Sequence, residues 1–140
     1  MSNYLGFSYA DSNGLPTTQE DVGRDLYEFL TQWYTLYPEF QPLPFYAFGE
    51  SYAGKFVPTI GKKIHDENLG NPKVKINLAG LGIGDGFMSP PDSSIYAEFL
   101  YQSSLVDGLK RDELLAKEEK MKGHCAAGEW RQAWEVSFTA

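Results

Sequence analysis

Apolar residues at helical spacing mark the first long element of the chain. Behind Thr17 and Glu20, which have the spacing of a capping box, apolar residues fall on one helical face: Val22, Leu26, Phe29, Leu30, Trp33 and Tyr37. An acidic first turn suits the helix dipole, and Pro38 stands where such a helix should stop. The pattern predicts an amphipathic helix between Thr17 and Tyr37.

Three short segments have the character of β-strands. "LGFSYA" (5–10) alternates weakly, "PFYAFG" (44–49) is aromatic and bounded by helix breakers, and "VKINLAGLGIG" (74–84) is a longer apolar run. Between the second and third segments, Val57, Ile60 and Ile64 predict a second helix that ends near Gly70. Because proline removes a helical hydrogen bond, we expect this helix to break or restart near Pro58.

The last third of the chain is predicted to be helical. "DGFMSPPDSS" (85–94) has the composition of a loop, whereas helices are expected over 94–107, 109–122 and, at the end, 128–136. The order strand, helix, strand, helix, strand predicts an α/β fold in which parallel strands are flanked by helices. Three strands leave the edges of such a sheet unsatisfied, so we expect the chain to be part of something longer.

Composition limits the classes of partner. A chain of 140 residues with 15% aromatic residues is typical of one globular domain. Its formal charge of -7 argues against nucleic acid or an anionic membrane as partner, since each of these would need a basic face. No apolar run has the length of a membrane span, and the first residues lack the features of a signal peptide.

The sequence predicts no metal and no cofactor. No histidine and cysteine pair has the spacing of a zinc site, and no glycine-rich segment has the pattern of a phosphate-binding loop. Cys125, the single cysteine, is either an ordinary thiol or one half of a disulfide whose partner is missing.

Ser51 is the candidate for chemistry. It stands in "GESYAG", after a predicted strand and before a predicted helix, where a sharp turn would expose its hydroxyl. Such an elbow needs small residues two positions before and after the serine, which here are Gly49 and Ala53, and Gly54 follows. The backbone N–H of Tyr52 would be one donor to an oxyanion. The alternative is a serine that only caps the helix.

A base for Ser51 is harder to find. Ser51, Asp85 and His124 occur in the order nucleophile, acid, base that this class of fold uses, but the segment before His124 is helical and charged rather than a strand. His65 follows on the helix after the serine, where it should point away. We expect solvated surface roles for both histidines and a turn role for Asp85.

Several segments together resemble the serine carboxypeptidase family of α/β-hydrolases. "GESYAGK" is similar to the family's nucleophile signature, and "GFSYAD", "EDVGRDLYEFLTQWYTLYPEF" and "VKINLAGLGIGDGFMSP" resemble the segments around it. "YAEFLYQSSLVD" is most similar to the vitellogenic-type members. The resemblance is close over residues 5–107 and weak beyond.

The resemblance implies a serine-type carboxypeptidase that releases C-terminal amino acids from peptides or proteins. Ser51 matches the nucleophile and Tyr52 the donor of an oxyanion N–H. Glu50 matches a glutamate whose carboxyl shares a proton with a second carboxyl and binds the terminal carboxylate of the substrate, which implies an acidic working range. The alternative for Glu50 is a solvated turn residue.

The chain also departs from the family. The asparagine-glycine-glycine-proline segment, the triad aspartate and histidine, the signal peptide and the disulfide partners of the family are not found in it, and Cys125 in "GHC" matches a disulfide cysteine. We therefore expect residues 1–140 to be a partial carboxypeptidase domain, inactive by itself, from a protein that is secreted or lysosomal when intact. Alternatives are an acyltransferase of the same fold and a non-catalytic truncation product.

Overall fold

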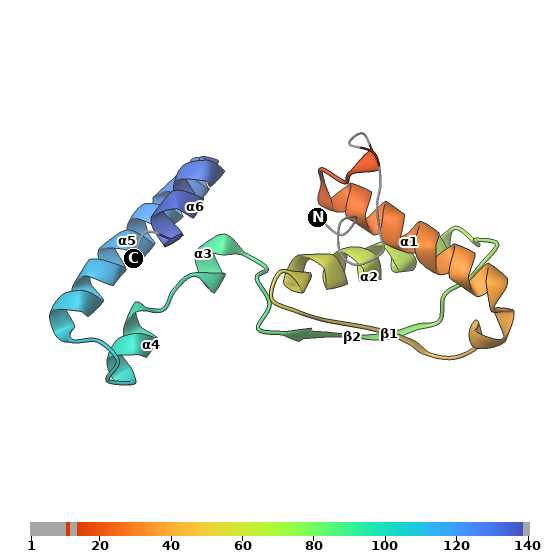
Figure 1. Cartoon of the computed structure of the whole chain (residues 1–140), viewed down its shortest axis with the longest axis horizontal. Helices are drawn as coiled ribbons and strands as arrows, with labels where there is room; N and C mark the ends of the chain where they lie inside the picture. The colour runs from red at the N-terminus through yellow and green to blue at the C-terminus, as the bar shows by residue number, and fades with distance from the viewer. Residues whose placement is uncertain (1–10, 12–13, 139–140) are drawn as a thin grey trace. The chain divides into compact units, whose positions relative to one another are not determined.

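The computed structural model describes residues 11 and 14–138. These residues belong to two compact units, Met1–Phe87 and Met88–Ala140 (Figure 1). The strand expected over residues 5–10 lies outside the described part.

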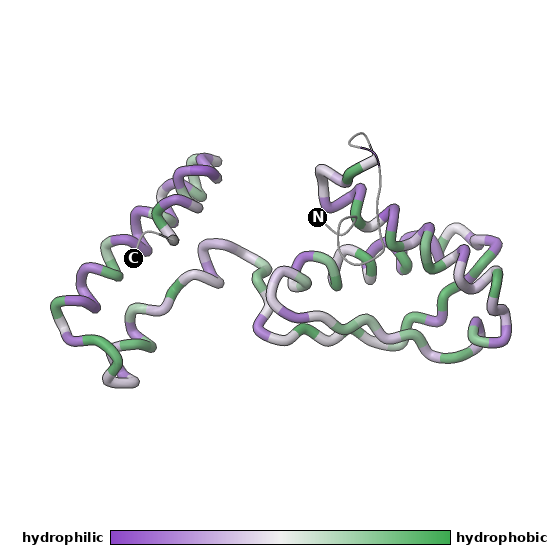
Figure 2. The backbone as a smooth tube through the Cα atoms, in the orientation of Figure 1, coloured by the Kyte–Doolittle hydropathy of each residue, from purple (hydrophilic) through white to green (hydrophobic). Residues whose placement is uncertain are grey.

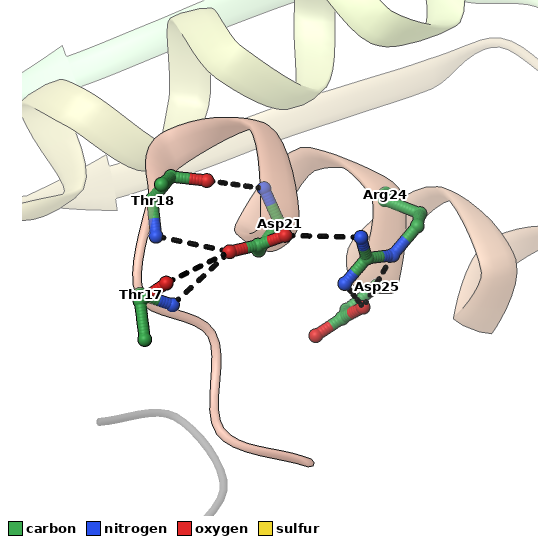
Figure 3. Close-up of polar contacts among 5 residues, drawn as sticks. All are labelled: Thr17, Thr18, Asp21, Arg24 and Asp25. Atoms are coloured by element: carbon green, nitrogen blue, oxygen red, sulfur yellow. Dashed lines mark hydrogen bonds and ion pairs between the residues drawn. The ribbon is translucent and has the colours of Figure 1, made fainter. Parts of the chain in front are cut away.

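Helix α1 (Gln19–Leu36) is capped one residue later than the sequence pattern suggested. Thr18 Oγ1 accepts a hydrogen bond from the N–H of Asp21 at 3.1 Å, and Asp21 Oδ2 accepts from the N–H groups of Thr17 and Thr18 at 3.2 and 3.1 Å (Figure 3). The predicted pairing of Thr17 with Glu20 is therefore wrong. The shorter carboxylate of Asp21 reaches back to the chain entering the helix, while Glu20 is exposed. A short 3-10 turn, η3 (Pro38–Phe40), follows the helix.

Two parallel strands form the sheet of the first unit. Strand β1 (Phe45–Glu50) pairs with β2 (Leu78–Gly84), and the register sets Ala47 opposite Leu81 and Glu50 opposite Gly84. β2 begins later than residue 74, because the side chain of Asn68 bonds the backbone of Ile76 in place of a neighbouring strand. Helix α2 (Ala53–Leu69) makes the crossover between the strands.

Pro58 does not break α2, contrary to expectation. The proline is exposed in the second turn of the helix and removes a single backbone donor. An interior proline costs about 3 kcal/mol. Val57, Ile60 and Ile64 are buried on the opposite side of the same turns, and burial of one such side chain contributes roughly 1.5–3 kcal/mol. Their burial outweighs the lost hydrogen bond, so the helix runs through.

Both helices of the first unit lie on one side of the sheet (Figure 1). The core of the first unit consists of Tyr34, Ile60, Ile64 and Ile76, and Phe45 and Ala47 of β1 pack against it. On the other face the rings of Tyr46 and Phe48 lie over Gly80 and Gly82 and are 53% and 76% exposed. One face of the sheet is thus covered and the other carries exposed aromatic rings.

The second unit is helical as its sequence predicts, but the helix boundaries differ and the short helix α3 lies inside the segment 85–94 that was predicted to be a loop. It contains α3 (Pro90–Ser93), α4 (Ala97–Gln102), α5 (Gly108–Ala126) and α6 (Trp130–Phe138). The helix expected over 94–107 is reduced to α4, because Ser104 takes a left-handed conformation (φ 59°) after it. Figure 2 shows hydrophilic residues along most of α5; its buried residue is Met121.

A carboxylate from α5 caps α4. Glu118 Oε1 accepts hydrogen bonds from the N–H groups of Tyr96 and Ala97 at 2.7 and 2.8 Å. These are N–H groups at the start of a helix, which lack intrahelical partners. The negative charge also suits the positive end of the helix dipole.

Among the described helices, none is long and apolar enough to cross a membrane.

Candidate active site

Ser51 lies between the last residue of β1 and the first turn of α2. Its backbone is left-handed (φ 57°), and its side chain is exposed. A residue other than glycine in this conformation costs of order 1–3 kcal/mol and persists only where the surrounding structure enforces it. The strand, the turn and the helix therefore hold an exposed hydroxyl on a strained backbone, as the elbow pattern in the sequence predicts.

Small residues around Ser51 allow the tight turn. A Cβ added at Gly49 would lie 2.3 Å from Cβ of Ala53. A Cβ added at Gly54 would lie 2.8–2.9 Å from backbone atoms of Gly86 and Phe87. No side chain fits at either glycine without moving the backbone. The turn therefore requires small residues in "GESYAG" for steric reasons.

The backbone of Ser51 is hydrogen-bonded to the last residue of β2 and to the turn that follows it. Its N–H donates to the carbonyl of Gly84 at 3.1 Å, and its carbonyl accepts from the N–H of Phe87 at 2.8 Å. The same carbonyl also accepts from the N–H of Gly54 at 3.0 Å. The sequence reasoning missed the role of residues 84–87; the glycine-x-glycine pattern directly after a predicted strand was the signal that could have revealed it.

Tyr52 begins α2 as its N-cap residue, in the right-handed helical region (φ -61°, ψ -17°). Its ring packs edge-on against Phe56, with 5.1 Å between the centroids. Helix geometry provides no intrahelical acceptor for the first N–H groups, and the helix dipole is positive there. The N–H of Tyr52 can therefore donate to an anion that forms next to Ser51.

Glu50 is the last residue of β1 and is exposed. It lies two and four residues after Phe48 and Tyr46, so all three side chains belong to the face of the sheet that the helices leave open. A shallow, open hollow at the carboxyl ends of the two strands is lined by Phe48, Gly49, Glu50, Gly82, Ile83, Gly84 and Asp85. Asp85 is itself left-handed (φ 42°), in keeping with a turn residue.

His65 belongs to the same compact unit as Ser51 but does not lie near it, and His124 belongs to the other unit. His65 is exposed on α2, about 18 Å along the helix axis from its first residue. In the second unit, Nδ1 of His124 lies 2.6 Å from Oε2 of Glu129. Cys125 is a half-buried free thiol. The described residues contain no cluster of three or more histidine, cysteine, aspartate or glutamate side chains that could hold a metal ion.

Known proteins match nearly the whole chain. The family model described as serine carboxypeptidase matches residues 4–136, which extends beyond residue 107, where the motifs in the sequence become weak. The probable serine carboxypeptidase CPVL of Homo sapiens is 42% identical over 134 residues, which are 94% of this chain and 28% of the relative. The vitellogenic carboxypeptidase of Aedes aegypti is 46% identical over 103 residues, covering 73% of this chain and 21% of the relative.

A solved structure shows the same fold. The prohormone-processing carboxypeptidase Kex1 of Saccharomyces cerevisiae superposes with a TM-score of 0.73 and 25% sequence identity, over 84% of this chain and 25% of that structure. The parallel strands with flanking helices are those of an α/β-hydrolase fold, as predicted. The chain spans about a quarter of the length of the relatives it matches.

Proposed function

This chain belongs to the serine carboxypeptidase family, and from that premise we propose that it carries the nucleophile of a serine-type carboxypeptidase. The observation that supports the proposal best is the conformation of Ser51. An exposed serine with a φ of 57°, placed between a parallel strand and a helix N-terminus, has the accessibility that a nucleophile needs.

In the proposed reaction, Oγ of Ser51 attacks the carbonyl carbon of the last peptide bond while a base removes its proton. The N–H of Tyr52 stabilises the negative charge that develops on the carbonyl oxygen. The C–N bond then breaks, the C-terminal amino acid leaves with a proton on its nitrogen, and an ester to Ser51 remains. Water hydrolyses the ester and restores the hydroxyl.

The base belongs to the whole enzyme rather than to these 140 residues. His65 is exposed on α2, well along the helix from Ser51, and His124 belongs to helix α5, whereas the base of this fold follows a strand. Both histidines of the sequence are within the described residues. Because a serine without a base is a weak nucleophile, the 140-residue chain by itself is expected to have no measurable peptidase activity.

Glu50 is proposed to bind the terminal carboxylate of the substrate. It precedes the nucleophile directly and lines the hollow at the carboxyl ends of the strands, the edge of a parallel sheet where ligands bind. Two carboxylates repel each other, so binding requires a proton that Glu50 shares with a second carboxyl group. The proposed activity therefore favours acidic solution.

The names of the relatives support a secretory or lysosomal location. One is the venom serine carboxypeptidase of Apis mellifera, 39% identical over 132 residues, which are 94% of this chain and 28% of the relative. Venom is a secreted fluid, and the yeast structure is named for the processing of prohormones. By this analogy the whole enzyme acts on peptides or proteins in such a compartment.

The test compares the whole enzyme with its Ser51→Ala variant on a blocked dipeptide that has a free C-terminus. Loss of the nucleophile should reduce turnover by roughly 10⁴–10⁶-fold. An acyl-glucose donor with an alcohol acceptor, assayed in parallel, distinguishes hydrolysis from acyl transfer. Turnover of the dipeptide that survives Ser51→Ala, or a preference for the alcohol acceptor, would overturn the proposal.

A further inference from the structure

The end of β2 and the turn that follows it hold the Ser51 backbone on both sides of its Cα atom. Gly84 accepts from the N–H of Ser51 at 3.1 Å, and the N–H of Phe87 donates to the carbonyl of Ser51 at 2.8 Å. These two bonds come from one segment four residues long, Gly84–Phe87, which begins at the last residue of β2. The left-handed conformation of Ser51 is thus fixed by a segment distant in sequence as well as by its own helix.

The same turn is in backbone contact with the first turn of α2. Only a hydrogen fits on Gly54, since a Cβ there would lie 2.8 Å from the nitrogen of Phe87 and 2.9 Å from the Cα and carbonyl carbon of Gly86. Because these neighbours are backbone atoms, they cannot rotate away as a side chain would. The position of the Gly86–Phe87 peptide is therefore coupled rigidly to the start of the helix.

A side-chain contact supports the same arrangement. Nζ of Lys55 lies 5.4 Å from the centre of the Phe87 ring, within the range of a cation–π interaction. Phe87 is half-buried. The ring contact and the backbone bond together tie Phe87 to the elbow from two directions.

We propose that Gly86 and Phe87 are positioning residues for the Ser51 nucleophile. They touch no reacting atom in this arrangement; they act by fixing the Ser51 backbone and hence the direction of its Oγ. The inference rests on the proposed function, because positioning has a meaning only if Ser51 attacks a substrate. A displacement of about 1 Å in an attacking group can reduce a rate by about 10²-fold.

The test uses four variants of the whole enzyme. Gly54→Ala forces the helix away from the Gly86–Phe87 backbone, and Phe87→Pro removes the N–H that bonds Ser51. Gly61→Ala is the matched control at another buried glycine of the same helix, where the added methyl meets the flexible end of the Leu81 side chain at 2.6 Å. Phe87→Ala keeps the N–H and loses only the ring.

We expect Gly54→Ala and Phe87→Pro to lower kcat by about 10–100-fold with KM changed by less than about 3-fold. The rate of labelling by a fluorophosphonate, which reports Ser51 without substrate binding, should fall in parallel. Gly61→Ala should stay within about 3-fold of the parent, and Phe87→Ala should keep at least about tenfold more kcat than Phe87→Pro.

The outcomes separate the two proposals. A parent enzyme without activity, or one unaffected by Ser51→Ala, contradicts the proposed function. An active parent in which Phe87→Pro equals Phe87→Ala, and in which Gly54→Ala equals Gly61→Ala, overturns the positioning role alone. If Gly54→Ala fails to fold, the Phe87 pair decides by itself.

Discussion

Asn68 hydrogen-bonds both backbone groups of Ile76: its Nδ2 donates to the carbonyl at 2.8 Å, and its Oδ1 accepts from the N–H at 3.3 Å. The side chain of Ile76 is fully buried. A side chain at the end of α2 therefore replaces a missing strand neighbour and fixes the approach to β2.

Asn68→Ala should destabilise the first unit by about 1–3 kcal/mol, because the N–H of Ile76 is then left without a partner. Urea unfolding followed by circular dichroism, at one protein concentration, measures the loss. Gln32→Ala, which removes an exposed amide from α1, is the control. Equal unfolding midpoints for the two variants would show that the Asn68 bonds contribute nothing.

Asp21 should make stability depend on pH in the acid range. The N–H of Thr17 is the main cause that lowers the pKa of Asp21 from 3.8 to about 2, followed by the side chain and the N–H of Thr18. Figure 3 shows the N–H groups of Thr17 and Thr18 donating to the Asp21 carboxylate. A pKa that is lower in the folded state stabilises the fold above the unfolded value. That stabilisation is lost as the pH falls through the folded value.

The stability difference between the parent and Asp21→Asn should therefore be greatest above about pH 4 and shrink as the pH approaches 2. Thermal unfolding over this pH range is the measurement, and Glu39→Gln controls for the removal of one negative charge. A difference that stays constant from neutral pH to pH 2 would contradict the assigned role of the Thr17 and Thr18 bonds.

The aromatic face of the sheet should make the 140-residue chain self-associate. Phe48 and Tyr46 are exposed beside each other, with 6.4 Å between ring centres, and exposed apolar patches favour association. Phe48→Lys should raise the concentration at which oligomers appear in sedimentation velocity. Leu69→Lys changes an equally exposed residue (76% for both) at the end of α2 and should have less effect. A parent chain that is monomeric at millimolar concentration would refute this.

Glu50→Gln should separate substrate binding from chemistry in the whole enzyme. An amide donates a hydrogen bond at any pH, whereas a shared carboxyl proton is lost as the pH rises. The variant should keep kcat/KM on a peptide acid further toward neutral pH than the parent does. A peptide amide, which lacks the free carboxylate, should show a smaller change. Identical changes for both substrates would limit Glu50 to a structural role at the elbow.

Periodicity predicted the elements whose signals are local. The apolar positions of α2 follow from spacing, and strand β1 follows from its aromatic residues and the helix breakers around it. The predicted face of α1 was right in part: Leu26, Leu30 and Trp33 pack against the core, but Phe29 and Tyr37 are exposed and the buried Tyr34 was missed. The cap of α1 and the boundaries of α4 were wrong because single residues decide them: Asp21 competes with Glu20, and Ser104 turns the chain. Pro58 was misjudged because its cost is local while the compensating burial is tertiary.

The sequence predicted the local features of the candidate site but not its contacts with distant segments. "GESYAG" indicates a turn that exposes Ser51, and the structure has that turn. The contacts of Ser51 with Gly84 and Phe87 could not be read from the motif, because a sequence does not state which distant segment lies beside it.

The parallel pairing of β1 and β2 has a kinetic consequence. Parallel strands cannot be joined by a tight turn. Residues 50 and 84 therefore pair only when the chain has crossed over from β1 to β2 through α2. Contacts between distant residues form slowly because the intervening loop must first be closed. The bonds from residues 84 and 87 that hold Ser51 in its left-handed state depend on this late step. A chain whose two strands are not paired lacks both of these bonds, so the left-handed conformation of Ser51 depends on closure of the sheet.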